Sequence, residues 1–149
     1  MTTGKLRHRV GNLFDATDLD ALGHGCNCAG VMGRGIATEF KRRWPPMYDE
    51  YRVRCRDGRF TPGSLFVWQT DGLTIYNLGT QSTWRRNATI SAIASSVGLM
   101  LDHADEVNLQ RIGIPRIGAG LGGLDWPDVE GAIMPLIDTS DVEVIVFSM

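Results

Sequence analysis

Apolar and polar positions alternate in short stretches typical of strands, and segments with an apolar residue every three or four positions, typical of helices, separate them. Ile36, Phe40 and Trp44 predict one apolar helix face that ends before Pro45-Pro46. Alternating stretches on both sides of Asp71-Gly72 predict a hairpin. The whole pattern predicts strands at 6–10, 21–27, 64–70, 73–78, 112–117 and 142–147, and helices from 36 to the prolines and at 47–55, 88–103 and 126–137.

This interleaving of strands and helices predicts an α/β fold, a three-layer α/β/α sandwich with a mixed central sheet. The chain has 149 residues with 43% apolar content, enough to bury one core, and no linker or repeat divides it. We therefore expect a single domain over residues 1–149. Ligands of such sheets bind beyond the carboxyl ends of the strands.

Two glycine-rich loops follow predicted strands. The first lies in the run Asn27-Cys28-Ala29-Gly30-Val31-Met32-Gly33-Arg34-Gly35-Ile36-Ala37, and the second is Gly118-Ala119-Gly120-Leu121-Gly122-Gly123. Glycine lets backbone N–H groups converge on an anion, and the helix that follows adds its positive dipole end. Neither loop is a P-loop, because no Gly-Lys-Ser/Thr follows the glycines. Two such loops predict a pyrophosphate site.

The second loop also fits G-x-G-x-x-G at Gly118, Gly120 and Gly123, so a dinucleotide site of the Rossmann type is an alternative. That fingerprint needs an acidic residue at the end of the next strand to hold the ribose. Here Asp141 and Glu143 lie at the beginning of that strand. The Rossmann alternative therefore lacks its ribose anchor, while a plain turn between strand and helix stays open for either loop.

Charge and cysteine content narrow the partners. A net charge of −2 disfavours a protein that coats nucleic acid non-specifically, yet 13 of the 15 basic residues are arginine and cluster at 42–43, 52–59 and 85–86. They form either a solvated surface or a rim for a phosphate-bearing partner. The N-terminal segment 1–5 lacks an apolar signal core, and no apolar run approaches the roughly 20 residues of a membrane span. The odd number of cysteines fits a reducing compartment, so we expect a cytoplasmic protein. We also expect a monomer without a membrane partner.

His24, Cys26 and Cys28 alternate on one face of the predicted strand 21–27, as metal ligands sometimes do. Residues two apart on a strand are separated by about 6.6 Å, so the three would span about 13 Å, too far for one tetrahedral ion. We interpret them as buried side chains and expect neither a metal nor a cofactor.

Four motifs together resemble the macrodomain family: Gly11-Asn12-Leu13, the run from Asn27 to Ala37, Asn77-Leu78-Gly79-Thr80 and Pro115-Arg116-Ile117-Gly118-Ala119-Gly120-Leu121. Within this family the chain looks most like the branch of the terminal ADP-ribose protein glycohydrolase and the DarG antitoxin macrodomain. The run from Gly30 to Ala37, followed by Phe40-Lys41, is specific to that branch, and the match extends over nearly the whole chain.

The resemblance implies that ADP-ribose binds with its pyrophosphate between the two loops. Asn12, next to Leu13, would accept a hydrogen bond at the adenine end, where many members carry an aspartate. Asn27 would reach the distal ribose, although a local turn role is an alternative. The other implied ligand contacts are Gly33, Arg34, Gly35, Ile36, Thr80, Gly118, Ala119, Gly120, Leu121 and Gly122.

Two departures from the branch concern catalysis. The position of its catalytic lysine is Gln81, and the position of the human enzyme's catalytic aspartate is Gly122. Glutamine can be neither an amine nucleophile nor a cation, so a lysine-dependent mechanism is not available and Asn27 and Gln81 become the catalytic candidates. Asp125, which precedes Trp126-Pro127, is interpreted as a helix cap, with catalysis as the alternative.

The resemblance thus implies an ADP-ribosyl glycohydrolase that removes ADP-ribose from a modified protein or nucleic acid by a lysine-independent route. The ligand's own diphosphate would hold the attacking water. Two alternatives stay open: a non-catalytic ADP-ribose reader and a phosphatase that acts on ADP-ribose phosphate.

Overall fold

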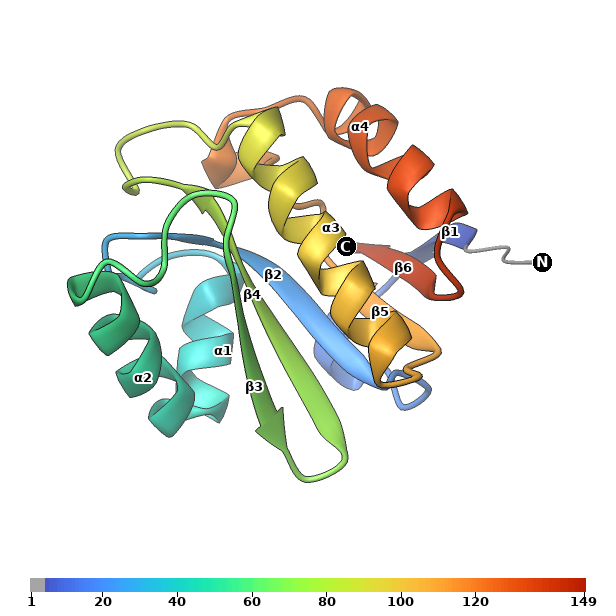
Figure 1. The fold of residues 1–149 in the computed structure, drawn as a ribbon, viewed down its shortest axis with the longest axis horizontal. Helices are drawn as coiled ribbons and strands as arrows, with labels where there is room; N and C mark the ends of the chain where they lie inside the picture. The colour runs from blue at the N-terminus through green and yellow to red at the C-terminus, as the bar shows by residue number, and fades with distance from the viewer. Residues whose placement is uncertain (1–4) are drawn as a thin grey trace.

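The computed structural model describes residues 5–149; most of the segment predicted to lack a signal core, residues 1–4, lies outside the described residues. Six strands form one sheet in the order β1-β6-β5-β2-β4-β3 (Figure 1). All neighbours pair in parallel except β3 with β4, which form the predicted hairpin. The strands are β1 Lys5–Val10, β2 Ala21–Asn27, β3 Leu65–Thr70, β4 Leu73–Gln81, β5 Arg111–Ile114 and β6 Glu143–Ser148.

Helices cover both faces of the sheet, which confirms the predicted three-layer α/β/α sandwich with a mixed sheet (Figure 1). The helices are α1 Ile36–Arg43, α2 Pro45–Arg56, α3 Ile90–Glu106 and α4 Trp126–Asp138. Successive strand residues point to opposite faces. In β6, Val144 and Val146 therefore pack with α3 and α4, while Ile145 and Phe147 pack with α1 and α2.

Several element boundaries differ from the prediction, three of them for a clear local reason. β5 ends at Ile114 rather than at 117, because Pro115 has no N–H to donate to the sheet. α3 begins at Ile90 rather than at 88, because Thr89 caps it by accepting from the amide of Ala92. The prolines after α1 are the first residues of α2, where the missing N–H costs nothing.

The topology brings the two glycine loops to one edge of the sheet. β2 and β5 are parallel neighbours, with Ala21 beside Ile112 and Leu22 beside Gly113. The loop from β2 to α1 and the loop from β5 to α4 therefore both leave the carboxyl ends of adjacent strands, where ligands of such sheets bind. Within the described residues, none of the helices is both long and apolar enough to cross a membrane.

Candidate functional site

The two glycine loops meet across a groove. Gly35 has φ 60° and ψ −148°, a conformation essentially restricted to glycine. A Cβ on Gly35 would lie 3.1 Å from Cδ1 of Leu121 in the second loop, whose side chain is 59% exposed. The first loop can approach the second this closely because residue 35 has no side chain.

Backbone amides on both walls lack partners. Outside the helices and strands, the amides of Gly33, Arg34, Gly35 and Gly118 donate to no backbone carbonyl of residues 5–149. Exposed amides without carbonyl partners need an acceptor from solvent or from a ligand. Several converging N–H groups form a concavity that binds anions.

The groove consists of three adjoining cavities. The first, of about 360 Å³, shares Arg34, Gln81 and Leu121 with the second, which lies between the two loops and has about 240 Å³. The second shares Ile36 and Pro115 with the third, of about 390 Å³. Together they follow the carboxyl edge of the sheet.

The groove gathers almost all of the site residues predicted from the sequence. In the list that follows, the residues run from the first cavity to the third: Asn27, Gly33, Arg34, Gln81, Leu121, Gly35, Ile36, Thr80, Gly118, Ala119, Gly122, Asn12 and Leu13. Gly120 belongs to the second loop but lines none of the three cavities. Its neighbourhood is open, since a Cβ added there would meet nothing within 4 Å.

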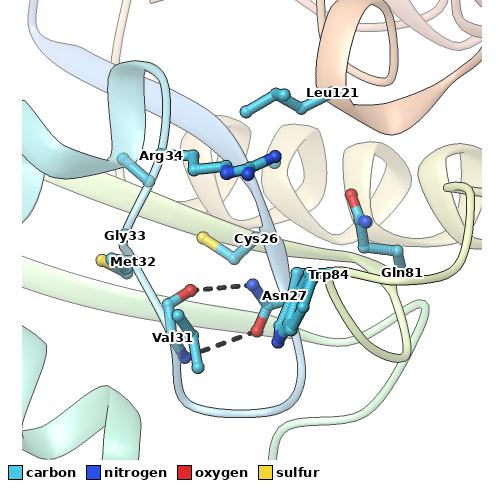
Figure 2. Close-up of a pocket in the computed structure, with 11 residues that line it drawn as sticks. Cys26, Asn27, Val31, Met32, Gly33, Arg34, Gln81, Trp84 and Leu121 are labelled. Atoms are coloured by element: carbon cyan, nitrogen blue, oxygen red, sulfur yellow. Dashed lines mark hydrogen bonds between the residues drawn. The ribbon is translucent and has the colours of Figure 1, made fainter.

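Asn27 holds the first loop in shape. Its Oδ1 accepts from the amide of Ala29 at 3.0 Å and from that of Val31 at 3.5 Å, and its Nδ2 donates to the carbonyl of Val31 at 2.7 Å (Figure 2). The turn role weighed in the sequence analysis is therefore present. One N–H of the amide has no partner among these contacts, and the side chain lines the first cavity.

Tyr51 of α2 is a site residue that sequence reasoning missed. Its hydroxyl donates to the carbonyl of Asn27 at 2.7 Å and lies 3.0 Å from Oδ1 of the same residue. Burial raises the pKa of Tyr51 above its usual value, so the hydroxyl stays a donor. The signal in the sequence was the spacing of Met47 and Tyr51, which places both on the buried face of α2.

Gln81, at the end of β4, closes the loop that follows. Its Nε2 donates to the carbonyl of Thr83 at 3.0 Å and to that of Arg86 at 2.8 Å. With the nitrogen engaged, Oε1 is left on the groove side, and Figure 2 shows it on the side of the second loop. A Cβ on Gly122 would lie 4.0 Å from Oε1, so the two positions at which the resemblance implies a catalytic lysine and aspartate lie close together.

Asn12 and Thr80 are anchored by the fold. Oδ1 of Asn12 accepts from the amide of Phe14 at 2.9 Å and caps a short 3-10 helix, Leu13–Asp15, which leaves that oxygen one lone pair for a ligand. The hydroxyl of Thr80 is buried and donates to the carbonyl of Cys26 at 3.3 Å. The Thr80 hydroxyl therefore donates to the neighbouring strand β2 and not into the groove.

Asp125 occupies the cap position of α4, as predicted, but its side chain makes no capping hydrogen bond. The expected capping contact is therefore wrong. Asp125 lines none of the three cavities of the groove, so the structure does not place it with the catalytic candidates.

Of the three residues that alternate along the end of β2, His24 and Cys26 are buried, as predicted, and Cys28 is half-buried. His24 is fully buried, stacks on Phe40 at 3.7 Å between ring centroids, and hydrogen-bonds Oδ1 of Asn77 at 2.7 Å. Burial lowers the pKa of His24 to about 4. Burial likewise raises the pKa of Cys28 to about 12, so its thiol is not a ready ligand or nucleophile.

Known proteins resemble this chain along most of its length. A DNA ADP-ribosyl glycohydrolase of Mycobacterium tuberculosis is 36% identical over 142 residues, covering 92% of this chain and 40% of that protein. A protein of the same name from Thermus aquaticus is 33% identical over 147 residues, covering 95% and 41%. The chain thus spans about two fifths of the length of these curated relatives.

Solved structures and a family model show the same similarity. The macrodomain of Thermus aquaticus DarG matches with a TM-score of 0.88 at 32% identity and covers 98% of this chain and 99% of that one. Residues 24–133 match the Macro domain family. These matches confirm the resemblance that the glycine loops suggested: the chain belongs to the macro domain family.

Proposed function

We propose that this chain is an ADP-ribosyl glycohydrolase that binds ADP-ribose in the groove and hydrolyses the bond between the distal ribose and its acceptor. The observation that carries the proposal is the set of unpartnered amides on both walls of the groove, at Gly33 to Gly35 and at Gly118. Such amides suit a pyrophosphate. The name of the relatives, DNA ADP-ribosyl glycohydrolase, supports DNA as the molecule that carries the ADP-ribose.

The three cavities define how ADP-ribose is oriented along the groove. The adenine end lies in the third cavity with Asn12 and Leu13, the pyrophosphate lies between the loops, and the distal ribose lies in the first cavity with Asn27 and Gln81. The backbone of the two loops holds the pyrophosphate, and the unpartnered N–H of Asn27 donates to a ribose hydroxyl. No metal or cofactor takes part.

Hydrolysis in this arrangement needs no lysine. The oxygen of water bonds to the anomeric carbon of the distal ribose, the bond to the acceptor breaks, and the acceptor leaves with the bonding electrons and takes up a proton. The ligand's own diphosphate holds the water, and Oε1 of Gln81 accepts a hydrogen bond from it and so orients it. The proton that the water loses is the one that the leaving acceptor takes up. Asn27 and Gln81 are thus the candidate catalytic residues.

A second candidate function is a non-catalytic ADP-ribose reader. It is favoured by one observation: the facing pair Gln81 and Gly122 carries neither the lysine nor the aspartate of the branch. A reader binds ADP-ribose through the groove and its amides but does not hydrolyse the bond to the acceptor.

Calorimetric titration of ADP-ribose, beside release assays on ADP-ribosylated single-stranded DNA, ADP-ribosylated protein and ADP-ribose phosphate, tests these functions. Binding with release of ADP-ribose from DNA supports the proposal. Binding without release identifies a reader, and strong gain of release in Gln81→Lys would then indicate a decayed enzyme. Release of phosphate alone identifies a phosphatase, and absence of binding overturns the assignment of the groove.

We propose further that the chain acts as a cytoplasmic monomer. All three cysteines, Cys26, Cys28 and Cys55, are free thiols, which suits a reducing compartment. Light scattering coupled to size-exclusion chromatography tests the monomer, and fractionation of the producing cells tests the location.

A further inference from the structure

Trp84 stands out at the mouth of the first cavity. It lines that cavity and is 51% exposed, whereas the chain's other tryptophans, Trp44, Trp68 and Trp126, are buried or half-buried. Asn27 lines the same cavity (Figure 2), at the end of the groove that the distal ribose occupies in the proposed function. A large apolar ring left in water next to a ligand cavity is a surface for contact.

The loop that carries Trp84 is held in one shape. The guanidinium carbon of Arg85 lies 4.7 Å from the centre of the Trp84 ring, a cation–π contact. The amide of Arg85 donates to the hydroxyl of Thr83 at 3.2 Å, and the amide of Arg86 donates to the carbonyl of Thr83 at 3.2 Å. Gln81 closes the loop from the other side. The exposed ring and its arginine are therefore preorganised.

The rim around this ring carries unneutralised positive charge. Arg34 lines the first cavity, and Arg85 and Arg86 follow Trp84 in the chain. None of the three forms an ion pair within residues 5–149, although seven other arginines of the chain do. In a protein with a net charge of −2, this local excess favours a polyanionic partner.

An aromatic ring with adjacent arginines is the arrangement that proteins use for single-stranded nucleic acid. The ring stacks on a base, and the arginines neutralise phosphates. Every phosphate of a nucleic-acid strand carries the negative charge that these arginines attract, whereas a peptide need not carry it. The position at the ribose end matters because the acceptor, which is attached to the distal ribose, leaves the groove through the mouth that Trp84 lines.

We propose that Trp84 forms a stacking platform for the nucleotide next to the one that carries ADP-ribose, with Arg34, Arg85 and Arg86 on the neighbouring phosphates. The chain then prefers a modified single strand of DNA to an isolated modified nucleotide. This inference rests on the proposed function, and it adds the residues that select the substrate's length and strandedness.

The test compares three probes: free ADP-ribose, an ADP-ribosylated mononucleotide, and a single strand of about ten nucleotides with one ADP-ribosylated base. The readout is the ratio of strand to mononucleotide in kcat/KM, or in Kd where a probe is not cleaved. In Trp84→Ala we expect this ratio to fall about tenfold, the loss of one stacked base. Trp84→Phe keeps a ring and should keep most of the preference.

Arg85→Ala should lower the same ratio and make the strand's affinity less dependent on salt, by about one phosphate contact. Lys5→Ala is the matched control, because it also removes one exposed positive charge but lies on β1, at the amino end of the parallel strands. The ratio in Lys5→Ala should equal that of the unmodified sequence.

Three outcomes would overturn the inference. The strand-to-mononucleotide ratio could stay unchanged in both Trp84→Ala and Arg85→Ala while both variants and the unmodified sequence still bind free ADP-ribose. That result would overturn this inference and leave the proposed function standing. Faster release from an ADP-ribosylated peptide than from the strand would also overturn it and would assign the rim to a protein partner. Failure of the unmodified sequence to bind free ADP-ribose would overturn the proposed function as well.

Discussion

The side-chain nitrogen of Gln81 donates to the carbonyl of Arg86 at 2.8 Å, and this hydrogen bond determines what the groove contains at that position. A second bond, to the carbonyl of Thr83, uses the same nitrogen. Two carbonyls can be satisfied only by the N–H side of the amide, so Oε1 must face the groove. At the position where the family resemblance implies a lysine, this chain presents a neutral hydrogen-bond acceptor.

Gln81→Ala should lower the rate of ADP-ribose release about tenfold, because the attacking water loses one orienting hydrogen bond. Gln81→Glu should lower the release rate further and should also weaken ADP-ribose binding. A carboxylate cannot donate to the carbonyls of Thr83 and Arg86, and its charge repels the diphosphate of the ligand. Steady-state release assays and calorimetric titrations of ADP-ribose measure the two effects separately. Affinity in Gln81→Glu equal to that of the unmodified sequence would contradict the orientation argued for the amide.

Gly35→Ala should weaken ADP-ribose binding at least tenfold. The backbone at Gly35 suits only glycine, so the substitution costs about 1–3 kcal/mol of strain, and the new Cβ would press on Leu121 across the groove. Titration of ADP-ribose gives the affinity, and urea unfolding gives the stability.

Gly72→Ala is the matched control for strain without crowding. Gly72 also has a positive φ, 71°, but lies in the hairpin between β3 and β4 with nothing within 4 Å of an added Cβ. It should lose stability by about 1 kcal/mol and keep its affinity for ADP-ribose. Equal loss of affinity in both variants would mean that strain, and not the narrowed groove, is responsible.

The fold could be predicted from the sequence because each strand and helix buries apolar residues that recur with the period of that element. The sequence could not predict the ends of elements that depend on single contacts. β4 continues to Gln81, three residues beyond its expected end at 78, because its later residues pair with β2 and are buried by the surrounding helices and loops. The strand predicted at 112–117 stops at Pro115 for lack of one N–H.

The groove was predictable from the glycine loops, since parallel neighbouring strands deliver both loops to one edge. The roles of individual side chains were less predictable, because they depend on contacts between segments far apart in the chain. Tyr51 of α2 reaches Asn27 at the end of β2, and a Cβ on Gly122 would lie 4.0 Å from Oε1 of Gln81. The spacing of Met47 and Tyr51 indicates that Tyr51 is buried, but not that its hydroxyl contacts Asn27.

Tyr51→Phe should destabilise the protein by about 1–2 kcal/mol and weaken ADP-ribose binding severalfold. The hydroxyl satisfies the carbonyl of Asn27, and without it the strand end that shapes the first loop is less fixed. Tyr48→Phe is a close control, because its hydroxyl makes only one longer contact, 3.4 Å, with the carbonyl of Gly30. Equal effects of the two substitutions would show that Tyr51 does not act through Asn27.

The buried His24 should make stability depend on pH below neutrality. Its imidazole is neutral in the folded protein, with a pKa of about 4, and titrates near 6.5 when the chain unfolds. The unfolded state therefore binds the proton first, and stability is complete above pH 6.5 and falls as the pH drops toward 4. Between pH 7 and pH 5 the loss should be about 2 kcal/mol, measured by urea unfolding.

His24→Gln provides the control for this dependence, since an amide can still donate to Oδ1 of Asn77 but does not titrate. The variant should be less stable at pH 7, because it loses the stacking on Phe40, yet its stability should change little between pH 7 and pH 5. The carboxylate with the most strongly lowered pKa, Glu39 at about 2, titrates below this window and does not interfere. The same pH dependence in His24→Gln as in the unmodified sequence would assign the acid sensitivity to other groups.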